Sequence, residues 1–595
     1  MKKLSEQFNV ISDALDLRDR YYEPRLSPIP CQMPPPQDLT ILNQGQDGAC
    51  TGFGLAAVIN RLYQQQNQNV LVSPWMIYNM ARRYDEWPGE TYEGSSCRGA
   101  IKGWLNTGVC LDSLYKKEDG NTPNFEQLED AKSRTIGAYY RIRPDITEMH
   151  YALQETYIIY VSAMIHDGWL KLRRNPNGEY VIPANKQQIG GHAFAIVGYN
   201  TEGFWVQNSW GRDWGDNGKA LWPYEDWLNS VLDAWVVQIA LPTPQIFDQL
   251  RRAGTRSTAN LAASATPSRN EIWRHFVHLN DGNFRDGGKY WSNESHIAAI
   301  ADNLQREKTN FDHLLFYAHG GLNTAKDSAR RIAAMKNVFI ENRIYPFHFM
   351  WDTGLLEIMK SILTDKSARA ERIAGGIRDW FDRRIENMTR FPGRAIWDEM
   401  KQNAAKPFES QDSHGSRTLK HILNTLNEIG NKQLHVAGHS AGAILQAHLL
   451  KRLFRGNMFN KVSSCSLLAP AANYDLYQHI YKPLIKNQKL ESTTIYNLSA
   501  EEEEDDNVAR VYGKSLLYLV SNAFEEKRGE ALMGMQIYND QIPMNEVKIH
   551  YSPSNATKSK THGGFDEDPA TMNSLLRKVL GKKPPRPFTT GDLEY

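Results

Sequence analysis

Short apolar runs alternate with longer amphipathic stretches through the second half of the chain. The runs are HLLFYAH (313–319), YPFHFMW (345–351), LHVAG (434–438), VSSCSLLAP (462–470), TTIYNLS (493–499) and VKIHYS (547–552). Runs of this length that are apolar throughout are typical of buried parallel strands, and the stretches between them have helical spacing. The pattern predicts an α/β domain with a mainly parallel sheet over residues 271–595.

A stretch of different character precedes this half. The segment RRAGTRSTANLAASATPSRN (251–270) is rich in Ala, Ser, Thr and Arg, and its large apolar residues show no periodicity. Such a segment cannot bury enough surface to order itself. We therefore expect a flexible linker over 246–270, preceded by a separate domain over 1–245 that is dense in Trp, Tyr and Gly.

A largely helical insertion over about 352–430 separates the predicted strand that ends at Trp351 from the next one, LHVAG. Within it, GLLEIMKSIL places Leu355, Leu356, Met359, Ile362 and Leu363 on one helix face. An apolar stripe of this kind fits a lid over a hydrophobic substrate, and it fits equally a helix that packs on the sheet.

Composition narrows the class of protein. The 595 residues are 41% apolar and 23% charged, with a net charge of +1, so neither a disordered chain nor a nucleic-acid-binding protein is indicated. No run of about 18 apolar residues predicts an integral membrane segment, and the N-terminus lacks the apolar core of a signal peptide. Five scattered cysteines favour a reducing compartment, so we expect a cytoplasmic protein, although export by a signal-less route leaves no mark in a sequence.

Three separated blocks of the first half carry the residue types of a thiol hydrolase. NQGQDGACTGFG places Cys50 on a turn before an apolar helix, where the helix dipole favours a thiolate. IGGHAFAIVGYN carries His192 on an apolar strand, and WVQNSWG carries Asn208 on the next one. A hairpin would bring His192 and Asn208 together. Cys50 would then be the nucleophile, His192 its base and Asn208 the group that orients the imidazole, while Gln44 could bind the oxyanion.

These blocks resemble the papain-like cysteine peptidases. The match comprises Gln44-Gly45 with Cys50, Gly191-His192-Ala193 with Val197-Gly198-Tyr199, and Asn208-Ser209-Trp210-Gly211 with the glycines that follow. The resemblance covers about 42–222 and implies an α+β papain-like fold that hydrolyses peptide bonds. It further implies that Trp210 shields the bond between His192 and Asn208 from water, and that Gly94-Ser95-Ser96 line the substrate groove.

Two positions depart from the papain pattern. Asp47 stands where many members have a cysteine, so the disulfide of that cysteine is not expected. Thr51 replaces the aromatic residue that usually follows the nucleophile, which leaves the shape of the oxyanion region open. The other cysteines, Cys31, Cys97, Cys110 and Cys465, are expected to be small buried hydrophobic side chains, and no Cys or His spacing suggests a metal site.

A second nucleophile motif lies in the α/β half. Gly438-His439-Ser440-Ala441-Gly442 directly follows the run LHVA and precedes an apolar helix, which is the context that G-x-S-x-G requires. The glycines allow a strained turn that presents Ser440 above the sheet edge. His319-Gly320-Gly321 follows an earlier strand, so N–H groups of Gly320 and Gly321 could meet an oxyanion together with that of Ala441.

This half resembles the lipase and esterase-like branch of the α/β hydrolases, over about 311–580. That resemblance implies an acid and then a histidine after Ser440 in the chain. Asp506, in a D-x-V turn after the run TTIYNLS, is the preferred acid, with Asp505 and Asp475 as competitors. His562 lies after the last predicted strand and before a terminal helix, and is the expected base.

Together the motifs predict a bifunctional hydrolase, acting on a peptide or protein through Cys50 and on an ester or lipid through Ser440. No cofactor is expected. One alternative is that a single domain is catalytic and the other regulates it, for example through self-cleavage at the linker. Another is a binding protein whose two pockets turn nothing over. A toxin or defence role rests on association alone.

Overall fold

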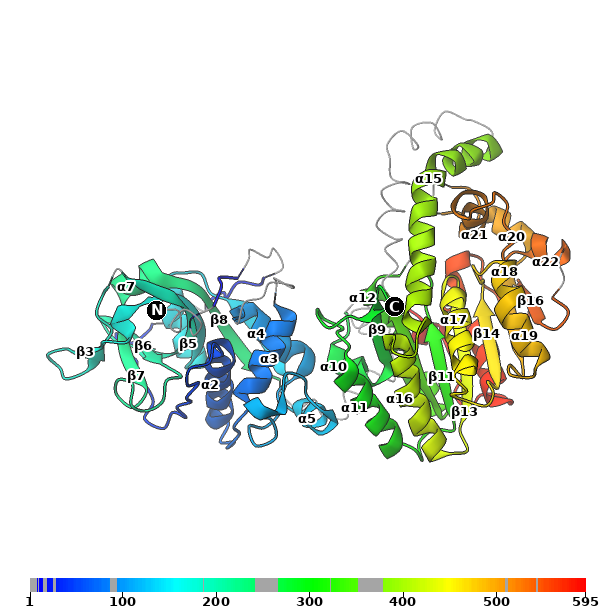
Figure 1. The fold of residues 1–595 in the computed structure, drawn as a ribbon. Helices are drawn as coiled ribbons and strands as arrows, with labels where there is room; N and C mark the ends of the chain where they lie inside the picture. Colours follow the sequence, from blue (N-terminus) through cyan, green and yellow to red (C-terminus); the bar gives the residue numbers. More distant parts are fainter. Residues whose placement is uncertain are drawn as a thin grey trace. The chain divides into compact units, whose positions relative to one another are not determined.

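The computed structural model describes residues 8, 10–13, 19–24, 28–85, 94–185, 187–240, 266–321, 323–351, 378–508, 512–541 and 544–595. The chain is divided into two compact units (Figure 1). The first contains the described residues up to 240 with Ser268–Asn270 and Asp286–Trp291, and the second contains Glu271–Arg285 and Ser292–Tyr595. Most of the expected linker over 246–270 lies outside the described residues.

The first unit combines helices with one mixed sheet. Its main helices are α2 (Cys50–Gln65), α3 (Pro74–Tyr84), α4 (Cys97–Thr107), α5 (Phe125–Ala131), α6 (Ile146–Thr156) and α7 (Tyr224–Ser230). Its strands are β1 (Ile136–Arg141), β2 (Ile159–His166), β3 (Arg173–Arg174), β4 (Tyr180–Val181), β5 (Gln188–Tyr199), β6 (Gly203–Gln207), β7 (Lys219–Pro223) and β8 (Val231–Ile239). Two short 3-10 turns, η1 (Lys117–Asp119) and η2 (Asp167–Trp169), complete it.

Strand β5 occupies the centre of this sheet, whose order is β1-β8-β2-β5-β6-β7-β4-β3. It pairs antiparallel with β2 and with β6, and the β5–β6 connection is the hairpin that the sequence predicts. Helix α2 packs closely on β5 because Gly54 has no side chain: a Cβ there would lie 3.1 Å from the main-chain nitrogen of Phe194. The N-terminus of α2 is thereby set beside the middle of β5.

The second unit is a mainly parallel sheet with helices packed against it. Its strands are β9 (Phe276–Asn280), β10 (Asn283–Phe284), β11 (His313–Ala318), β12 (Ile344–Trp351), β13 (Gln433–His439), β14 (Ser464–Leu468), β15 (Thr493–Leu498) and β16 (Lys548–Ser552). Its longer helices are α11 (Glu294–Arg306), α12 (Ala325–Glu341), α15 (Arg378–Ala405), α16 (His414–Ile429), α17 (Gly442–Arg455) and α23 (Pro569–Leu580). Shorter ones are α18 (Tyr474–Leu476), α19 (Lys482–Lys486), α20 (Ala500–Asp505), α21 (Leu516–Leu519) and α22 (Gln536–Gln541), and the short helix α10 (Arg269–Ile272) has two residues in each unit. Single turns are η3 (Trp273–His275), η4 (Lys406–Phe408), η5 (Tyr477–Tyr481), η6 (Val520–Phe524), η7 (His562–Gly564) and η8 (Thr590–Asp592).

The six predicted strands of this half are all present, in the order β10-β9-β12-β11-β13-β14-β15-β16. Pairing is parallel throughout except between β9 and β10. Helices α12 and α23 share one apolar core with the strands, formed by side chains such as Phe339, Tyr317 and Leu575. Parallel strands end at the same sheet edge, so the loops after β11, β13, β15 and β16 converge there.

The described part of the helical insertion is the long helix α15, which rises beyond the end of the sheet beside α21 (Figure 1). It packs closely on η6, since a Cβ at Gly393 would lie 2.2 Å from the ring of Phe524. Tyr512 donates a hydrogen bond to Glu386 of α15 at 2.8 Å, and the Gly513 N–H donates to Asp382 at 2.9 Å. The amphipathic stretch that contains Leu355 and Leu363 lies outside the described residues.

Candidate functional site

Cys50 is the first residue of α2, so its thiol lies at the positive end of a helix dipole. Glycine allows this helix to approach its neighbours: a Cβ at Gly52 would lie 2.3 Å from the carbonyl oxygen of Pro74. Cys50 is 1% exposed, and the main-chain N–H of Ala193 from β5 interacts with its sulfur. The fold thus brings Cys50 to the strand that carries His192.

His192 and Asn208 meet across the β5–β6 hairpin. His192 Nε2 lies 2.8 Å from Asn208 Oδ1, and the Ser209 N–H donates to the same oxygen at 2.8 Å. An amide oxygen only accepts, so His192 carries its proton on Nε2 and leaves Nδ1 with a lone pair. Trp210 covers this bond, its ring 4.9 Å from that of His192. Nδ1 has no hydrogen-bond partner among the described residues, and it is the atom that can take a proton from a thiol.

Two hydrogen bonds fix the side chain of Gln44, six residues before Cys50. Its Nε2 donates to the Asp47 carbonyl oxygen at 2.8 Å, and Ser209 Oγ donates to its Oε1 at 2.7 Å. One N–H of the amide is therefore bonded within the turn, and the second is the one available for an oxyanion.

The two residues that depart from the papain pattern both have side-chain partners. Asp47 forms an ion pair with Lys117, and Thr51 Oγ1 lies 2.5 Å from Ser95 Oγ. All five cysteines are free. Cys97, Cys110 and Cys465 are buried as expected, but the expectation was wrong for Cys31, which is exposed. Gly94 is buried directly before Ser95.

Burial sets the protonation state of this site. It raises the pKa of Cys50 to about 11, against the opposing effect of main-chain N–H groups of Ala193 and Thr51. It lowers the pKa of His192 to about 4, against the hydrogen bond with Asn208. Both shifts disfavour the charged form, so the enclosed site holds a neutral thiol beside a neutral imidazole.

The enclosure includes a segment from the start of the chain. The Val10 N–H donates to the Gly191 carbonyl oxygen at 3.2 Å, and the Gly191 N–H donates to the Phe8 carbonyl oxygen at 3.1 Å. The Phe8 ring lies against His192 and Trp210, with centroid distances of 5.8 and 5.7 Å. Only glycine permits this approach, because a Cβ at Gly191 would lie 1.9 Å from the Val10 carbonyl oxygen. Phe8 and Val10 are therefore bonded to the strand that carries His192, and the Phe8 ring packs against the imidazole.

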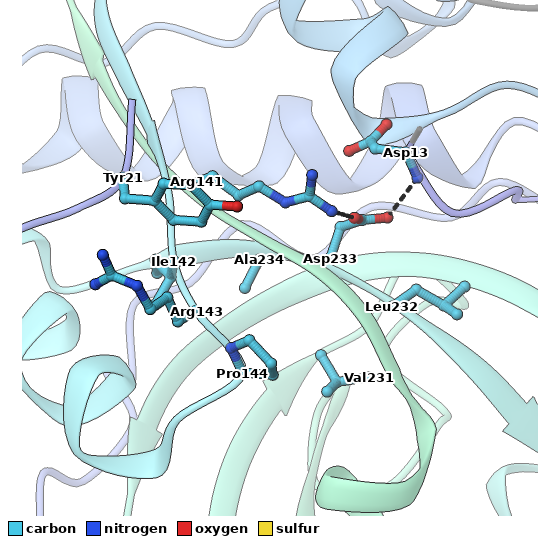
Figure 2. A pocket seen from close by; sticks show the side chains of 10 residues that line it. All are labelled: Asp13, Tyr21, Arg141, Ile142, Arg143, Pro144, Val231, Leu232, Asp233 and Ala234. Atoms are coloured by element: carbon cyan, nitrogen blue, oxygen red, sulfur yellow. Dashed lines mark hydrogen bonds and ion pairs between the residues drawn. The ribbon is translucent and has the colours of Figure 1, made fainter. Parts of the chain in front are cut away.

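Asp13 anchors the same segment a few residues later. Its carboxylate accepts from the Arg98 main-chain N–H and from Trp235 Nε1, each at 2.9 Å, and its own N–H donates to Asp233 at 2.9 Å. Burial, and then the nearby charge of Asp233, raises the pKa of Asp13 to about 7. Figure 2 shows this acid pair at the edge of a cavity of about 220 Å³ that Arg141 also lines. The cavity contains none of the candidate nucleophiles.

Ser440 occupies the sharp turn between β13 and α17. Its φ of 53° is in the left-handed region, and its N–H donates to the Leu468 carbonyl oxygen at 2.8 Å. Such backbone strain in a non-glycine residue is typical of functional sites. Gly442 permits the turn, since a Cβ there would lie 2.2 Å from the Ala318 carbonyl oxygen.

His562 meets Ser440 at the carboxyl edge of the sheet, with Nε2 2.8 Å from Oγ. Asp506 contacts the same histidine, but through the main chain: its Oδ2 accepts from the His562 N–H at 2.8 Å, and its Oδ1 accepts from the Asn507 N–H at 2.7 Å. Of the competing acids, Asp505 is exposed, and Asp475 lies on the surface beside His479. The structure therefore brings Asp506 to His562 and keeps Asp475 away.

The loop after β11 lies beside Ser440. A Cβ at Gly320 would lie 3.2 Å from the Ser440 Cβ, so this loop comes close to the serine. Asn323 Nδ2 donates to the Gly320 carbonyl oxygen at 3.1 Å, and Arg331 donates to Asn323 Oδ1 at 3.1 Å. Gly321 follows in the loop, and Ala441 caps the first turn of α17.

A buried charged cluster behind this site was not predicted from sequence. Asp566 forms an ion pair with Arg331 at 2.8 Å, accepts from the Tyr317 hydroxyl at 2.9 Å and lies 3.3 Å from His439 Nδ1. His439 Nε2 in turn lies 2.9 Å from the His562 carbonyl oxygen. The only signal in the sequence was position: His439 is the second residue of the G-x-S-x-G motif, and Asp566 follows His562 by four residues.

Within the described residues no helix has the length and apolar content to cross a bilayer. The same residues contain no group of three or more His, Cys, Asp or Glu side chains arranged for a metal ion.

The site combines a thiol at the start of a helix with an imidazole and an amide on a hairpin. This arrangement of Cys50, His192 and Asn208 is typical of the class of cysteine peptidases. The family model of papain family cysteine proteases matches residues 38–222. An uncharacterised peptidase C1-like protein of Acanthamoeba polyphaga mimivirus is 28% identical over 34% of this chain and 71% of its own length. Macrodontain-1 of Ananas macrodontes is 27% identical over 30% of this chain and 80% of its own. Xylellain, a cysteine protease of Xylella fastidiosa with a solved structure, is 25% identical with a TM-score of 0.35, and the match covers 40% of this chain and 97% of that one.

The N-terminal part of the chain is therefore a papain-like cysteine peptidase domain. The matches cover different shares of the relatives: cathepsin J of Mus musculus is spanned over only 54% of its length.

Proposed function

We propose that the chain is a hydrolase with two active sites, a thiol site around Cys50 and a serine site around Ser440. In the first, Cys50 attacks the carbonyl carbon of a peptide bond after its proton passes to His192 Nδ1. Asn208 holds the imidazole, and the second N–H of Gln44 stabilises the oxyanion. His192 then protonates the leaving amine, and water releases the acyl group from the sulfur.

The observation that carries the second activity is the 2.8 Å contact between Ser440 Oγ and His562 Nε2 on a strained strand-to-helix turn. Together with a mainly parallel sheet and the order Ser440, Asp506, His562, it supports an α/β-hydrolase fold. Ser440 would attack an ester carbonyl while His562 takes its proton. The N–H groups of Ala441 and Gly320 would stabilise the oxyanion, the alkoxide would leave with the proton from His562, and water would release the acyl group.

The long helix α15 and the apolar stretch before it favour an ester with a hydrophobic acyl group as substrate of the second site. A cytoplasmic setting remains a proposal that rests on the free thiols.

Paired substitutions test each activity. Cys50→Ala is expected to abolish hydrolysis of a peptide substrate, while Cys110→Ala, which changes another buried free thiol, is expected to leave it within about twofold. Ser440→Ala is expected to abolish hydrolysis of a p-nitrophenyl ester, with Ser466→Ala on the neighbouring strand β14 as control. Ester hydrolysis that persists in Ser440→Ala would contradict the second activity.

A further inference from the structure

Arg331 is a buried cation that contacts two loops of the serine site. It belongs to helix α12, which follows the loop of Gly320 in the chain, and it is 5% exposed. Its ion-pair partner Asp566 is fully buried and follows His562 by four residues. A guanidinium stays protonated in proteins, and its planar fork can donate in more than one direction. Arg331 can therefore hold both loops at once.

On the side of His562, Arg331 is held by its ion pair. Arg331 Nε lies 2.8 Å from Asp566 Oδ2 and donates to the Tyr595 hydroxyl at 3.0 Å. The Tyr317 hydroxyl donates to the same carboxylate oxygen at 2.9 Å. Burial raises the pKa of Asp566, but the opposing effects, of which the charge of Arg331 is the largest, hold that pKa well below its usual range. Asp566 is therefore a carboxylate, and it ties the segment after His562 to α12.

The other side of the guanidinium reaches the loop after β11 through an amide. Arg331 Nη2 donates to Asn323 Oδ1 at 3.1 Å, and Asn323 Nδ2 donates to the Gly320 carbonyl oxygen at 3.1 Å. His319 Nδ1 lies 2.8 Å from the same carbonyl oxygen, so both lone pairs of that oxygen are engaged. The peptide unit between Gly320 and Gly321 is planar, and bonds to its carbonyl therefore also fix the direction of its N–H.

We propose that Arg331 and Asn323 are positioning residues of the serine site: Arg331 ties the segment that carries His562 to the loop beside Ser440, and Asn323 holds the Gly320 peptide so that the loop can stabilise an oxyanion. The inference rests on the proposed serine activity. Both residues act through the main chain that they hold. Since an oxyanion forms only during the reaction, their loss should slow turnover and leave binding of the ester unchanged.

Asn323→Asp separates positioning from packing. A carboxylate still accepts from Arg331, but it cannot donate to the Gly320 carbonyl, so the loop loses one anchor while the ion pair stays intact. In steady-state hydrolysis of a p-nitrophenyl ester by the full-length chain, kcat should fall by about 10- to 100-fold and KM should change by less than about threefold. The melting temperature should stay close to that of the wild type.

Asn342→Asp is the matched control at the opposite end of α12. Asn342 Nδ2 donates to the carbonyl oxygens of Val338 and Arg586 at 2.8 and 2.6 Å. The same exchange of amide for carboxylate removes these donors away from the serine site. It should lower the melting temperature and leave kcat within about twofold of the wild type.

A second pair of variants tests whether Arg331 acts through Asn323. Arg331→Lys keeps a charge beside Asp566 but lacks the fork of a guanidinium, so it should also lower kcat. Because both changes release the same loop, the double variant with Asn323→Asp should be within about twofold of the slower single variant. Arg330→Lys is the control, since Arg330 pairs with Asp327 on the same helix, and it should keep the wild-type kcat.

Four results would overturn the inference. They are a wild-type kcat in Asn323→Asp, a rise in KM in place of a fall in kcat, losses that multiply in the double variant, or unfolding of Asn323→Asp while Asn342→Asp stays folded. Ester hydrolysis that is equal in the wild type and in Ser440→Ala would instead reject the serine activity itself, and the inference with it.

Discussion

Replacement of Phe8 by alanine should uncover the thiol site. Phe8 is 5% exposed and packs on His192 and Trp210. Burying a phenylalanine side chain contributes about 1.5–3 kcal/mol, and favourable ring pairs add about 0.5–1.5 kcal/mol. The lost contact is thus worth about 2–4 kcal/mol. A free-energy change of 1.4 kcal/mol changes an equilibrium constant tenfold. The equilibrium ratio of molecules with an uncovered site to molecules with a covered site should therefore rise by about 30- to 1,000-fold, and the uncovered form should predominate.

Uncovering also changes the chemistry of the nucleophile. Burial is the main cause that raises the pKa of Cys50 and lowers that of His192. Water admitted to the site relieves both effects and favours the thiolate beside an imidazolium, which is the reactive state.

The assay is the second-order rate of alkylation of Cys50 by an epoxysuccinyl reagent at pH 7, followed by intact mass, with Cys50→Ala to identify the modified residue. Phe8→Ala should react at least tenfold faster than the wild type. Ile11→Ala is the control, because Ile11 belongs to the same segment and is 37% exposed. Equal rates for Phe8→Ala and the wild type would refute the reasoning.

Three further predictions concern single side chains. Asp506→Asn should slow fluorophosphonate labelling of Ser440 by about 10- to 100-fold, because a buried N–H donor left without an acceptor costs about 1–3 kcal/mol. Asp505→Asn is the control, since Asp505 is exposed, and it should change the labelling rate by less than twofold. Equal effects of the two substitutions would reject Asp506 as the acid. Gly442→Ala should destabilise the second unit by about 1–3 kcal/mol and lower its melting temperature by several degrees, because its Cβ would lie 2.2 Å from the Ala318 oxygen; an unchanged melt would contradict the tight turn. The pKa of Asp13 is raised from 3.8 to about 7, so the folded state binds more protons than the unfolded state between these values and loses stability as pH rises through them. Asp13→Asn should therefore gain stability relative to the wild type from pH 4.5 to 7.5 in urea titrations, and a constant difference would reject the raised pKa.

Local pattern was sufficient to predict the strands that carry Ser440 and its neighbours. Each is a short apolar run bounded by polar turns, and a strand that is apolar at every position is expected to be buried on both faces. Strand β9 and its partner β10 were missed, although Asp281-Gly282 between them is a hairpin signal: both have positive φ, 48° and 82°. The run FVHLN is too short and too polar to stand out without its tertiary partners.

Local sequence motifs were likewise sufficient to predict some of the site residues but not others. Cys50, His192, Asn208, Ser440 and His562 could be chosen because each stands in a local motif that fixes its backbone. Phe8, Asp566 and Arg331 could not, because their roles depend on contacts across the fold: Arg331 pairs with a residue more than 200 positions away. The mode of contact of Asp506, through the His562 main chain, likewise depends on how two loops from separate strands meet.

The measurement that tests the two-site account most directly is intact mass after parallel incubation with an epoxide for thiols and a fluorophosphonate for serines, with Cys50→Ala and Ser440→Ala as controls. The account predicts one adduct from each reagent, each lost only in its matching variant. A missing adduct, or one that survives in the matching variant, would contradict the claim of two competent active sites.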